Sequence, residues 1–197
     1  MSQQPAASTG LDSTVGRGPV LIVGTLRILA LDKEAKLCVG PRPWERGSAE
    51  NPAHAIAALA QDAGITAILD LNADALEERA TRDGGLTYRG IHVLDDGKPL
   101  SPSILDTASR AVRELLDSGH RVYLHCTFGR GRSPTVAAAY LIAYQGTSAA
   151  AARAWIEELD AKWLHRGIWT GYDARFPGRL EEFERWVRGE PNGRDQG

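Results

Sequence analysis

The chain has 197 residues, of which 43% are hydrophobic and 24% are charged. This length and balance suit one globular domain that buries its own core without metals or disulfides. The formal net charge of -2 argues against a nucleic-acid-binding protein, which usually carries a clear basic excess.

The cysteine count and the apolar stretches bear on where the protein acts. Cys38 and Cys126 are too few for a secreted disulfide framework, and the first ten residues lack the basic start and apolar run of a secretory signal. The longest apolar stretch, Val20 to Leu31, contains Arg27 and is too short to cross a bilayer. We therefore expect a cytoplasmic protein with no membrane span.

Strand and helix patterns alternate between two polar ends. We expect residues 1–18 and 189–197 to be disordered, because they are rich in small and polar residues, and residues 19–188 to form one domain. In chain order, the expected strands are 24–31, 37–39, 66–71, 86–94 and 121–125. The expected helices are 51–62, 73–82, 101–118, 133–145, 147–159 and 179–187. This alternation predicts an α/β fold with a central mixed, mostly parallel sheet of about four to five strands and helices on both faces.

The loop after the strand 121–125 carries the pattern that points to chemistry. The loop follows the carboxyl end of a strand, which is where ligands bind in such sheets. Within the loop, five residues separate Cys126 from an Arg-Ser pair. Gly129 and Gly131 can take φ > 0 and have no Cβ, so the backbone N–H groups can turn toward one point. The helix that begins near Ser133 adds the positive end of its dipole. We assign this cradle for an oxyanion to Thr127, Phe128, Gly129, Arg130, Gly131 and Arg132.

Three side chains of the loop are candidate catalytic groups. Arg132 offers a planar fork that binds two phosphoryl oxygens at once. Cys126 lies in this positive field, so its thiol pKa should fall well below ~8.5 and give a thiolate. Ser133 can donate a hydrogen bond to the thiolate and help it leave. A lone cysteine after an apolar strand is usually a small buried hydrophobic residue, but the glycines, the arginine and the helix start coincide here.

The segment Val122–Thr135 resembles the active-site loop of protein-tyrosine and dual-specificity phosphatases, and the resemblance extends weakly over residues 37–187. It implies the fold of cysteine phosphatases, no cofactor, no metal and a phosphocysteine intermediate. It also implies an aspartate acid on a mobile upstream loop. Asp95 and Asp96 lie 31 and 30 positions before Cys126, and the resemblance favours Asp95. Arg179 stands where the family suggests a glutamine, which puts a water-positioning amide there in doubt.

The implied substrate is a phosphorylated protein or a small phosphoester, with phosphotyrosine first and phosphoserine or phosphothreonine next. An inositol phosphate or a phospholipid is an alternative, although Thr127 and Phe128 are uncharged where lipid-directed members often carry lysines. Phe128 can wall the site or pack inward, and Arg130 can bind a second anionic group or be solvated. Two other interpretations stay open: a rhodanese-like sulfur transferase and a catalytically dead phosphate-binding module.

Overall fold

We describe the protein from a computed structural model, which covers residues 20–23, 26–30, 34, 36–44, 51–163 and 176–189. The expected disordered segment 1–18 lies outside these residues, as do residues 190–197 of the expected tail 189–197 and residues 164–172 of the aromatic-rich segment 163–172. None of the helices described is long and apolar enough to cross a membrane.

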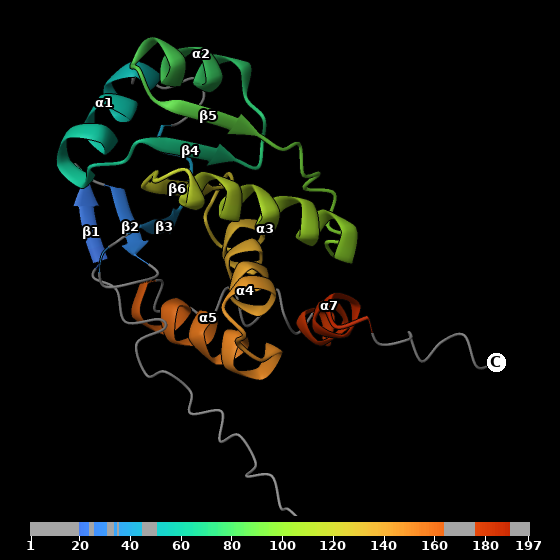
Figure 1. The fold of residues 1–197 in the computed structure, drawn as a ribbon. Helices are drawn as coiled ribbons and strands as arrows, with labels where there is room; N and C mark the ends of the chain where they lie inside the picture. The colour runs from blue at the N-terminus through green and yellow to red at the C-terminus, as the bar shows by residue number, and fades with distance from the viewer. Residues whose placement is uncertain are drawn as a thin grey trace, which may run out of the picture.

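The described strands form one mixed sheet (Figure 1). Its order is β1 (Val20–Val23), β2 (Leu26–Ala30), β3 (Leu37–Gly40), β6 (Val122–His125), β4 (Ala67–Asp70) and β5 (Thr87–Gly90). The strands from β3 to β5 pair in parallel, and β1 and β2 add antiparallel pairs at one edge. The predicted α/β class with a mixed, mostly parallel sheet is confirmed.

Two details of the predicted sheet are wrong. The described sheet has six strands rather than four to five, because residues 20–23 form an edge strand that the sequence shows only as part of an apolar stretch. The strand expected over residues 86–94 ends at Gly90. Beyond it, the amides of Ile91 and Val93 still donate to the carbonyls of Asp70 and Leu71, at 2.9 and 3.1 Å. The backbone of residues 91–93 therefore still runs alongside the end of β4 past the regular strand.

Helices cover both faces of the sheet (Figure 1). One face carries α1 (Pro52–Ala63) and α2 (Ala75–Asp83). The other carries α3 (Pro102–Asp117) and α4 (Arg132–Tyr144), against which α5 (Ala149–Trp163) and α7 (Arg179–Val187) pack. Alternate strand residues supply the two cores, as the two-residue period of a strand requires. In β3, Leu37 and Val39 belong to the core under α3 and α4, and Cys38 belongs to the core under α1.

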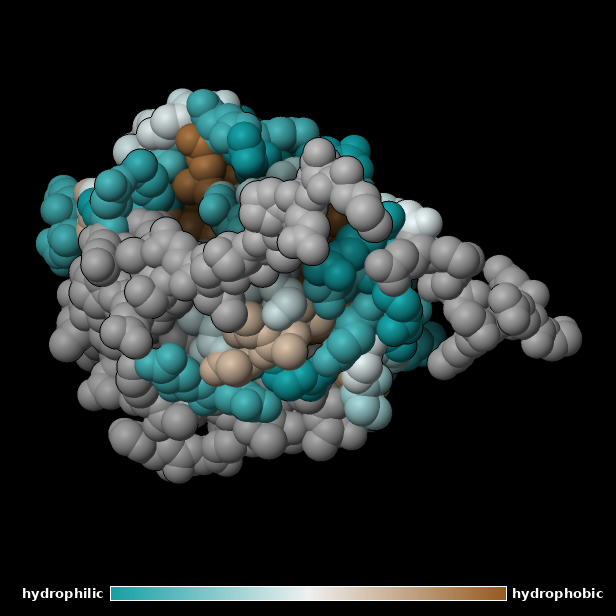
Figure 2. Space-filling model, turned by 60° about the horizontal axis from the view of Figure 1, so that its bottom comes forward, coloured by the Kyte–Doolittle hydropathy of each residue, from teal (hydrophilic) through white to brown (hydrophobic). Residues whose placement is uncertain are grey.

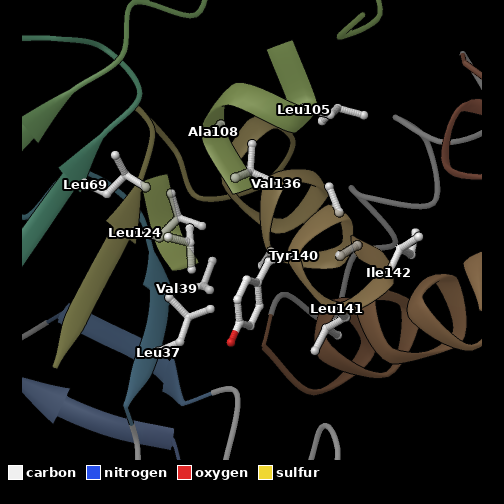
Figure 3. Close-up of a cluster of buried hydrophobic side chains, with 14 of the residues drawn as sticks. Leu37, Val39, Leu69, Leu105, Ala108, Leu124, Val136, Tyr140, Leu141 and Ile142 are labelled. Carbon is white, nitrogen blue, oxygen red and sulfur yellow. The ribbon is translucent and has the colours of Figure 1, made fainter. Parts of the chain in front are cut away.

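The larger core fixes the position of α4. Val136, Ala137, Ala138 and Ala139 are completely buried, because α3, α5 and α7 surround this helix. Figure 3 shows the apolar side chains between sheet and helix, among them Leu37, Val39, Leu69, Leu124, Val136 and Tyr140. A helix buried on all sides holds its first turn in one place relative to the sheet, and that first turn borders the Cys126 loop.

Helix starts follow local capping chemistry. The Asn51 side chain accepts a hydrogen bond from the amide of Ala53 at 2.9 Å, and proline follows at the first turn of α1. The Ser101 hydroxyl likewise accepts from the amide of Ile104 at the start of α3. The helix expected over residues 147–159 with Thr147 as its cap begins instead at Ala149, and the hydroxyl of Ser148 accepts from the amide of Ala151 at 3.2 Å.

Hydrophilic residues cover most of the coloured surface in Figure 2, and hydrophobic residues appear there as separate patches. Charged pairs one helical turn apart lie on the surface of the helices, such as Arg82 with Glu78 and Arg113 with Asp117. Such exposed pairs contribute little to the free energy of unfolding. The two apolar cores therefore provide most of the stability.

Candidate active site

The Cys126 loop lies at the carboxyl end of β6, between β3 and β4 in the middle of the sheet. The helix after it begins at Arg132, one residue before the expected start, with Gly131 as its N-cap residue. Parallel strands end here together, so the loop occupies the usual ligand position of an α/β sheet. The backbone of the β3 end supports the loop, because the amide of Arg42 donates to the carbonyl of Thr127 at 3.1 Å.

The Cys126 thiol lies at the bottom of the loop, and the residue is 3% exposed. Burial raises the pKa of Cys126, but a hydrogen bond with the Ser133 hydroxyl, the amides of Ser133 and Gly129 and the charge of Arg132 together bring the pKa below its ordinary value. The Ser133 oxygen is 3.4 Å from Sγ and 3.3 Å from the carbonyl oxygen of Gly40. The single hydroxyl proton of Ser133 can therefore form a hydrogen bond either with Sγ of Cys126 or with the carbonyl oxygen of Gly40.

Arg132 connects the loop to the upstream acidic segment. Its Nη1 donates to the carbonyl of Val93 at 2.8 Å, and its Nη2 donates to the Asp95 carboxylate at 2.9 Å and to the Thr127 hydroxyl at 3.0 Å. The Arg132 residue is only 6% exposed, so these contacts hold the guanidinium in one place. The structure thus brings Cys126, Arg132 and Asp95 together as the sequence predicts.

The two adjacent aspartates differ in their contacts. The Asp95 side chain is 62% exposed and reaches the Arg132 guanidinium. Asp96 instead accepts a hydrogen bond from the amide of Lys98 at 3.1 Å and pairs with the Lys98 ammonium at 3.4 Å. The hydrogen bond with the Lys98 amide is the main cause that lowers the pKa of Asp96. Asp95 is therefore the aspartate that faces the loop, and Asp96 stabilises the turn.

The two loop glycines have different conformations. Gly129 takes φ = 67°, in the left-handed region that glycine tolerates best. Gly131 takes φ = -129°, so positive φ is not what this position requires. Gly129 is also close to the end of β3: a Cβ there would lie 2.5 Å from the amide nitrogen of Pro41 and 2.8 Å from the carbonyl oxygen of Gly40. Only glycine fits this crossing of two backbones.

Replacing Gly129 with alanine should therefore lower the free energy of unfolding by more than the left-handed backbone conformation alone would. The left-handed conformation costs about 1–2 kcal/mol for a residue with a Cβ, and the contact with Gly40 and Pro41 adds to this. The free energy of unfolding from urea titration measures the loss. Gly146→Ala is the matched control, because Gly146 has φ = 66° with open space around it. Equal losses in the two variants would contradict the backbone contact.

The rim of the loop carries an aromatic and a cationic side chain. Phe128 is 65% exposed, so it does not pack inward, and Arg130 is exposed beside it. Thr127 is directed inward instead: its hydroxyl donates to the Asn72 side chain at 2.9 Å and accepts from Arg132. Phe128 and Arg130 are available to touch the part of a ligand that lies outside the cradle.

Several residues behind the loop belong to no motif that the sequence shows. Asn72 contacts Thr127, and the fully buried His125 lies against two fully buried carboxylates, Asp70 and Glu77. A signal for Asp70 was present, because it ends the buried strand β4 as His125 ends β6, and the two residues are register partners. No comparable signal marks Glu77, which reads as an ordinary acidic residue in the first turn of a helix.

Three further residues have neighbours outside the Cys126 loop. Cys38 is buried in the core on the sheet face opposite to that of Cys126, so a disulfide between these two does not fit this fold. Arg179 pairs with Glu182 at 2.6 Å at the start of α7. Lys98 pairs with Asp96. The side chains of the aromatic-rich segment 163–172, whose role the sequence leaves open, lie outside the described residues.

Comparisons with known proteins agree with this geometry. The family model "Dual specificity phosphatase, catalytic domain" matches residues 49–167. The fold is similar to that of P. aeruginosa TpbA, with a TM-score of 0.61 and 14% identity over 87% of this chain and 99% of that chain. It is also similar to PTPMT1 (TM-score 0.56, 20% identity, 79% of this chain and 91% of that chain) and human DUSP28 (0.54, 20%, 79% and 95%).

No curated protein sequence matches the chain. The sequence identities to the solved structures are low, so the similarity to them shows the fold alone. The family model, in contrast, spans more than half of the chain and includes both the Cys126 loop and the Asp95 segment. This match favours the phosphatase interpretation over the sulfur transferase. The chain therefore belongs to the dual specificity phosphatase catalytic domain family.

Proposed function

We propose that the chain is a cysteine-dependent phosphatase that hydrolyses phosphate monoesters through a phosphocysteine intermediate. One observation carries the proposal: the buried Cys126, with its lowered thiol pKa, lies at the start of α4 beside Arg132, whose guanidinium also binds the Asp95 carboxylate. A nucleophile, an anion clamp and a carboxyl group are thus within reach of one phosphoryl group.

In the first step, the Cys126 thiolate attacks phosphorus in line with the leaving oxygen. A sulfur–phosphorus bond forms, the bond from phosphorus to the leaving oxygen breaks, and protonated Asp95 gives its proton to that oxygen. The fork of Arg132 and the loop amides bind the non-bridging oxygens, where charge gathers in the transition state. The phosphoryl group replaces the Asp95 carboxylate on Nη2, while Nη1 keeps its contact with Val93.

In the second step, Asp95 is a carboxylate and takes a proton from a water molecule that attacks the phosphocysteine. The sulfur–phosphorus bond breaks, phosphate leaves and the thiolate returns. Ser133 stabilises the departing sulfur, because its hydroxyl proton can move from the Gly40 carbonyl to Sγ. No group other than these residues and water takes part in the proposed steps.

Hydrolysis of p-nitrophenyl phosphate across a pH series tests this function. Because the pKa of Cys126 is lowered, the thiolate persists to lower pH than that of an ordinary cysteine and is lost as the pH falls through that lowered value. We expect kcat/KM to be high near neutrality and to fall on the acid side. A rate that instead rises with pH up to about 8.5, as an ordinary thiol ionises, would contradict the proposed site. No turnover at any pH would contradict the function.

We further propose phosphotyrosine as the preferred substrate group, supported by the exposed apolar side chains of Phe128 and Leu94 next to Thr127 and Asp95. Phosphoserine and phosphothreonine are smaller and reach these side chains less well. The second candidate is an inositol phosphate, since PTPMT1, a fold relative, has a structure in complex with PI(5)P and Arg130 offers an exposed cation at the rim.

A panel of substrates distinguishes these classes. The comparison uses kcat/KM for a phosphotyrosine peptide, the matching phosphothreonine peptide, a soluble inositol phosphate and vesicles that contain PI(5)P. We expect the phosphotyrosine peptide to be preferred and Phe128→Ala to reduce that preference. A preference for the inositol compounds that is lost in Arg130→Ala would support the second candidate. Thiosulfate turnover without ester hydrolysis would revive the sulfur transferase.

A further inference from the structure

A side chain that follows β4 reaches the Cys126 loop from behind. Asn72 lies two residues after the end of the strand at Asp70, and its side-chain oxygen accepts a hydrogen bond from the Thr127 hydroxyl at 2.9 Å. The Thr127 oxygen in turn accepts from Nη2 of Arg132 at 3.0 Å. The steps of the proposed reaction do not use Asn72, although only Thr127 separates it from the guanidinium that binds phosphate.

The hydrogen bonds in this chain of side chains all run in one direction. Nδ2 of Asn72 donates to a carboxylate oxygen of Asp70 at 3.0 Å, so the other end of the Asn72 amide, Oδ1, faces Thr127. The Thr127 hydroxyl has a single proton and donates it to Oδ1. A guanidinium can only donate, so the Thr127 oxygen keeps a lone pair for Arg132. Asn72 therefore determines where the Thr127 hydroxyl proton points.

The turn after β4 fixes the position of Asn72. The backbone amides of Asn72 and Asp74 donate to the two oxygens of Asp70, at 2.7 and 2.8 Å. These contacts form the turn from backbone amides, so the oxygen of the Asn72 side chain is not needed for it. Between them, Ala73 takes φ = 51°, the one positive φ at a residue other than glycine in the part of the chain that the structure describes. Such a conformation is unfavourable for a residue with a Cβ and persists where its surroundings impose it.

Thr127 is one of two uncharged groups that hold the Arg132 guanidinium. Nη1 donates to the carbonyl of Val93 at 2.8 Å, and Nη2 donates to the Thr127 hydroxyl. A planar group that is held at two nitrogens does not turn about its own axis. A carbonyl and a hydroxyl have no net charge, so they leave the positive charge of Arg132 available to a phosphoryl group. Both contacts remain when that group replaces the Asp95 carboxylate on Nη2.

The contact with Asn72 selects the Thr127 conformation that makes this possible. Threonine has few χ1 rotamers, and the observed one presents Oγ1 to Asn72 and Arg132 at once. A change of χ1 by about 120° to another staggered rotamer would move Oγ1 away from both partners. Without Asn72, the hydroxyl proton would also be free to turn toward Nη2, where two donors would face each other.

We propose that Asn72 is a positioning residue for the phosphate clamp: it orients the Thr127 hydroxyl, which holds Nη2 of Arg132 where the phosphoryl oxygens bind. The proposal rests on the proposed function only in assigning phosphate binding to Arg132. Its tests measure anion affinity and the guanidinium itself, and neither measurement needs phosphatase turnover.

The first measurement is the affinity for tungstate by isothermal titration calorimetry. We expect the Kd to rise about tenfold in Asn72→Ala and in Thr127→Val, the order of effect of one lost hydrogen bond at a charged group. Thr127→Ser keeps the hydroxyl and should therefore retain most of the affinity. Wild-type affinity in Asn72→Ala, or a loss in Thr127→Ser as large as in Thr127→Val, would overturn the proposal.

Asn51→Ala is the matched control for this measurement. The Asn51 side chain also accepts one hydrogen bond just before a helix, from the amide of Ala53, but it does so at the start of α1. Its replacement should lower the melting temperature through the lost cap and leave the tungstate affinity unchanged. Equal weakening of tungstate binding in Asn51→Ala and Asn72→Ala would mean a general loss of structure and would overturn the specific role of Asn72.

A double-variant cycle shows whether Asn72 acts through Thr127. In a Thr127→Val background, Asn72→Ala should weaken tungstate binding no further, because the hydroxyl that Asn72 orients is already absent. A second full loss of affinity in the double variant would overturn the proposed route.

The second measurement observes the Arg132 guanidinium in the protein without an added anion. Nitrogen NMR of the arginine side chains, with Arg132 assigned by the loss of its signals in Arg132→Lys, gives the rate at which Nη1 and Nη2 exchange by rotation. We expect this exchange to be faster in Asn72→Ala than in the wild type. Equal exchange rates would overturn the proposal.

These outcomes are distinct from a failure of the proposed function. A protein whose tungstate affinity depends on Asn72 as expected, but which hydrolyses no phosphate ester, would contradict the function and leave the role of Asn72 standing. Ester hydrolysis with the same tungstate affinity in Asn72→Ala and the wild type would do the reverse. A wild type that binds no tungstate would overturn both.

Discussion

Replacing Cys126 with serine should abolish phosphate-ester hydrolysis and leave anion binding intact. The hydroxyl of serine is far less acidic than a thiol, so the surrounding charges that stabilise a thiolate do not give an alkoxide at neutral pH. We expect kcat to fall by more than about 10⁴-fold, the order seen when a nucleophile is removed from a site that acts as a unit. The loop amides and Arg132 remain, so tungstate should still bind, as isothermal titration calorimetry can measure.

Cys38→Ser is the matched control for this experiment. Cys38 is the other buried cysteine, and it lies in the core on the opposite face of the sheet. Its replacement should lower the melting temperature somewhat but leave kcat unchanged in the folded protein. Hydrolysis that survives in Cys126→Ser and disappears in Cys38→Ser would refute the site assignment.

Replacing Asp95 with asparagine should produce the second-largest loss. A general acid contributes about 10²–10⁴-fold to the rate, and it matters most when the leaving oxygen is basic. We therefore expect a loss in this range for a phenyl phosphate and a much smaller one for p-nitrophenyl phosphate, whose leaving group needs little protonation. Tungstate should bind at least as well as to the wild type, because Asp95 no longer competes for Nη2 of Arg132.

Asp96→Asn provides the comparison. Asp96 is the adjacent acid, but it bonds to Lys98 rather than to Arg132. This variant should keep its rate with both substrates. If Asp96→Asn showed the leaving-group dependence and Asp95→Asn did not, the general acid would be Asp96. The contact between Asp95 and Arg132 would then have a role other than proton transfer.

Local sequence signals explain the elements that could be predicted well. The Asn51-Pro52 pair and Gly64 bracket α1 as expected, because capping and the left-handed turn depend on residues within the helix ends themselves. The Cys126 loop could be predicted equally well, because its glycines, its arginine and the helix start are adjacent in the chain. Where the chemistry is contained in one segment, a sequence pattern is sufficient.

Features that depend on contacts between distant segments could not be predicted in this way. The loop sequence does not show that Gly129 takes a positive φ against the backbone at the end of β3 while Gly131 takes a negative φ. Glu77 becomes a buried partner of His125 only when α2 packs beside the loop, while the next residue, Glu78, stays on the surface. A helical pattern does not distinguish two such neighbours when the buried one is charged.

The measurement that tests the central claim most directly is a search for the phosphocysteine itself. Asp95→Asn is the protein to use, because the loss of the base should slow hydrolysis of the intermediate while p-nitrophenyl phosphate still forms it. After rapid acid quenching, we expect peptide mass spectrometry to find one phosphoryl group on Cys126, and none when Cys126→Ser is added. A phosphoryl group on another residue, or continued turnover with no covalent intermediate in any quenched sample, would contradict the account.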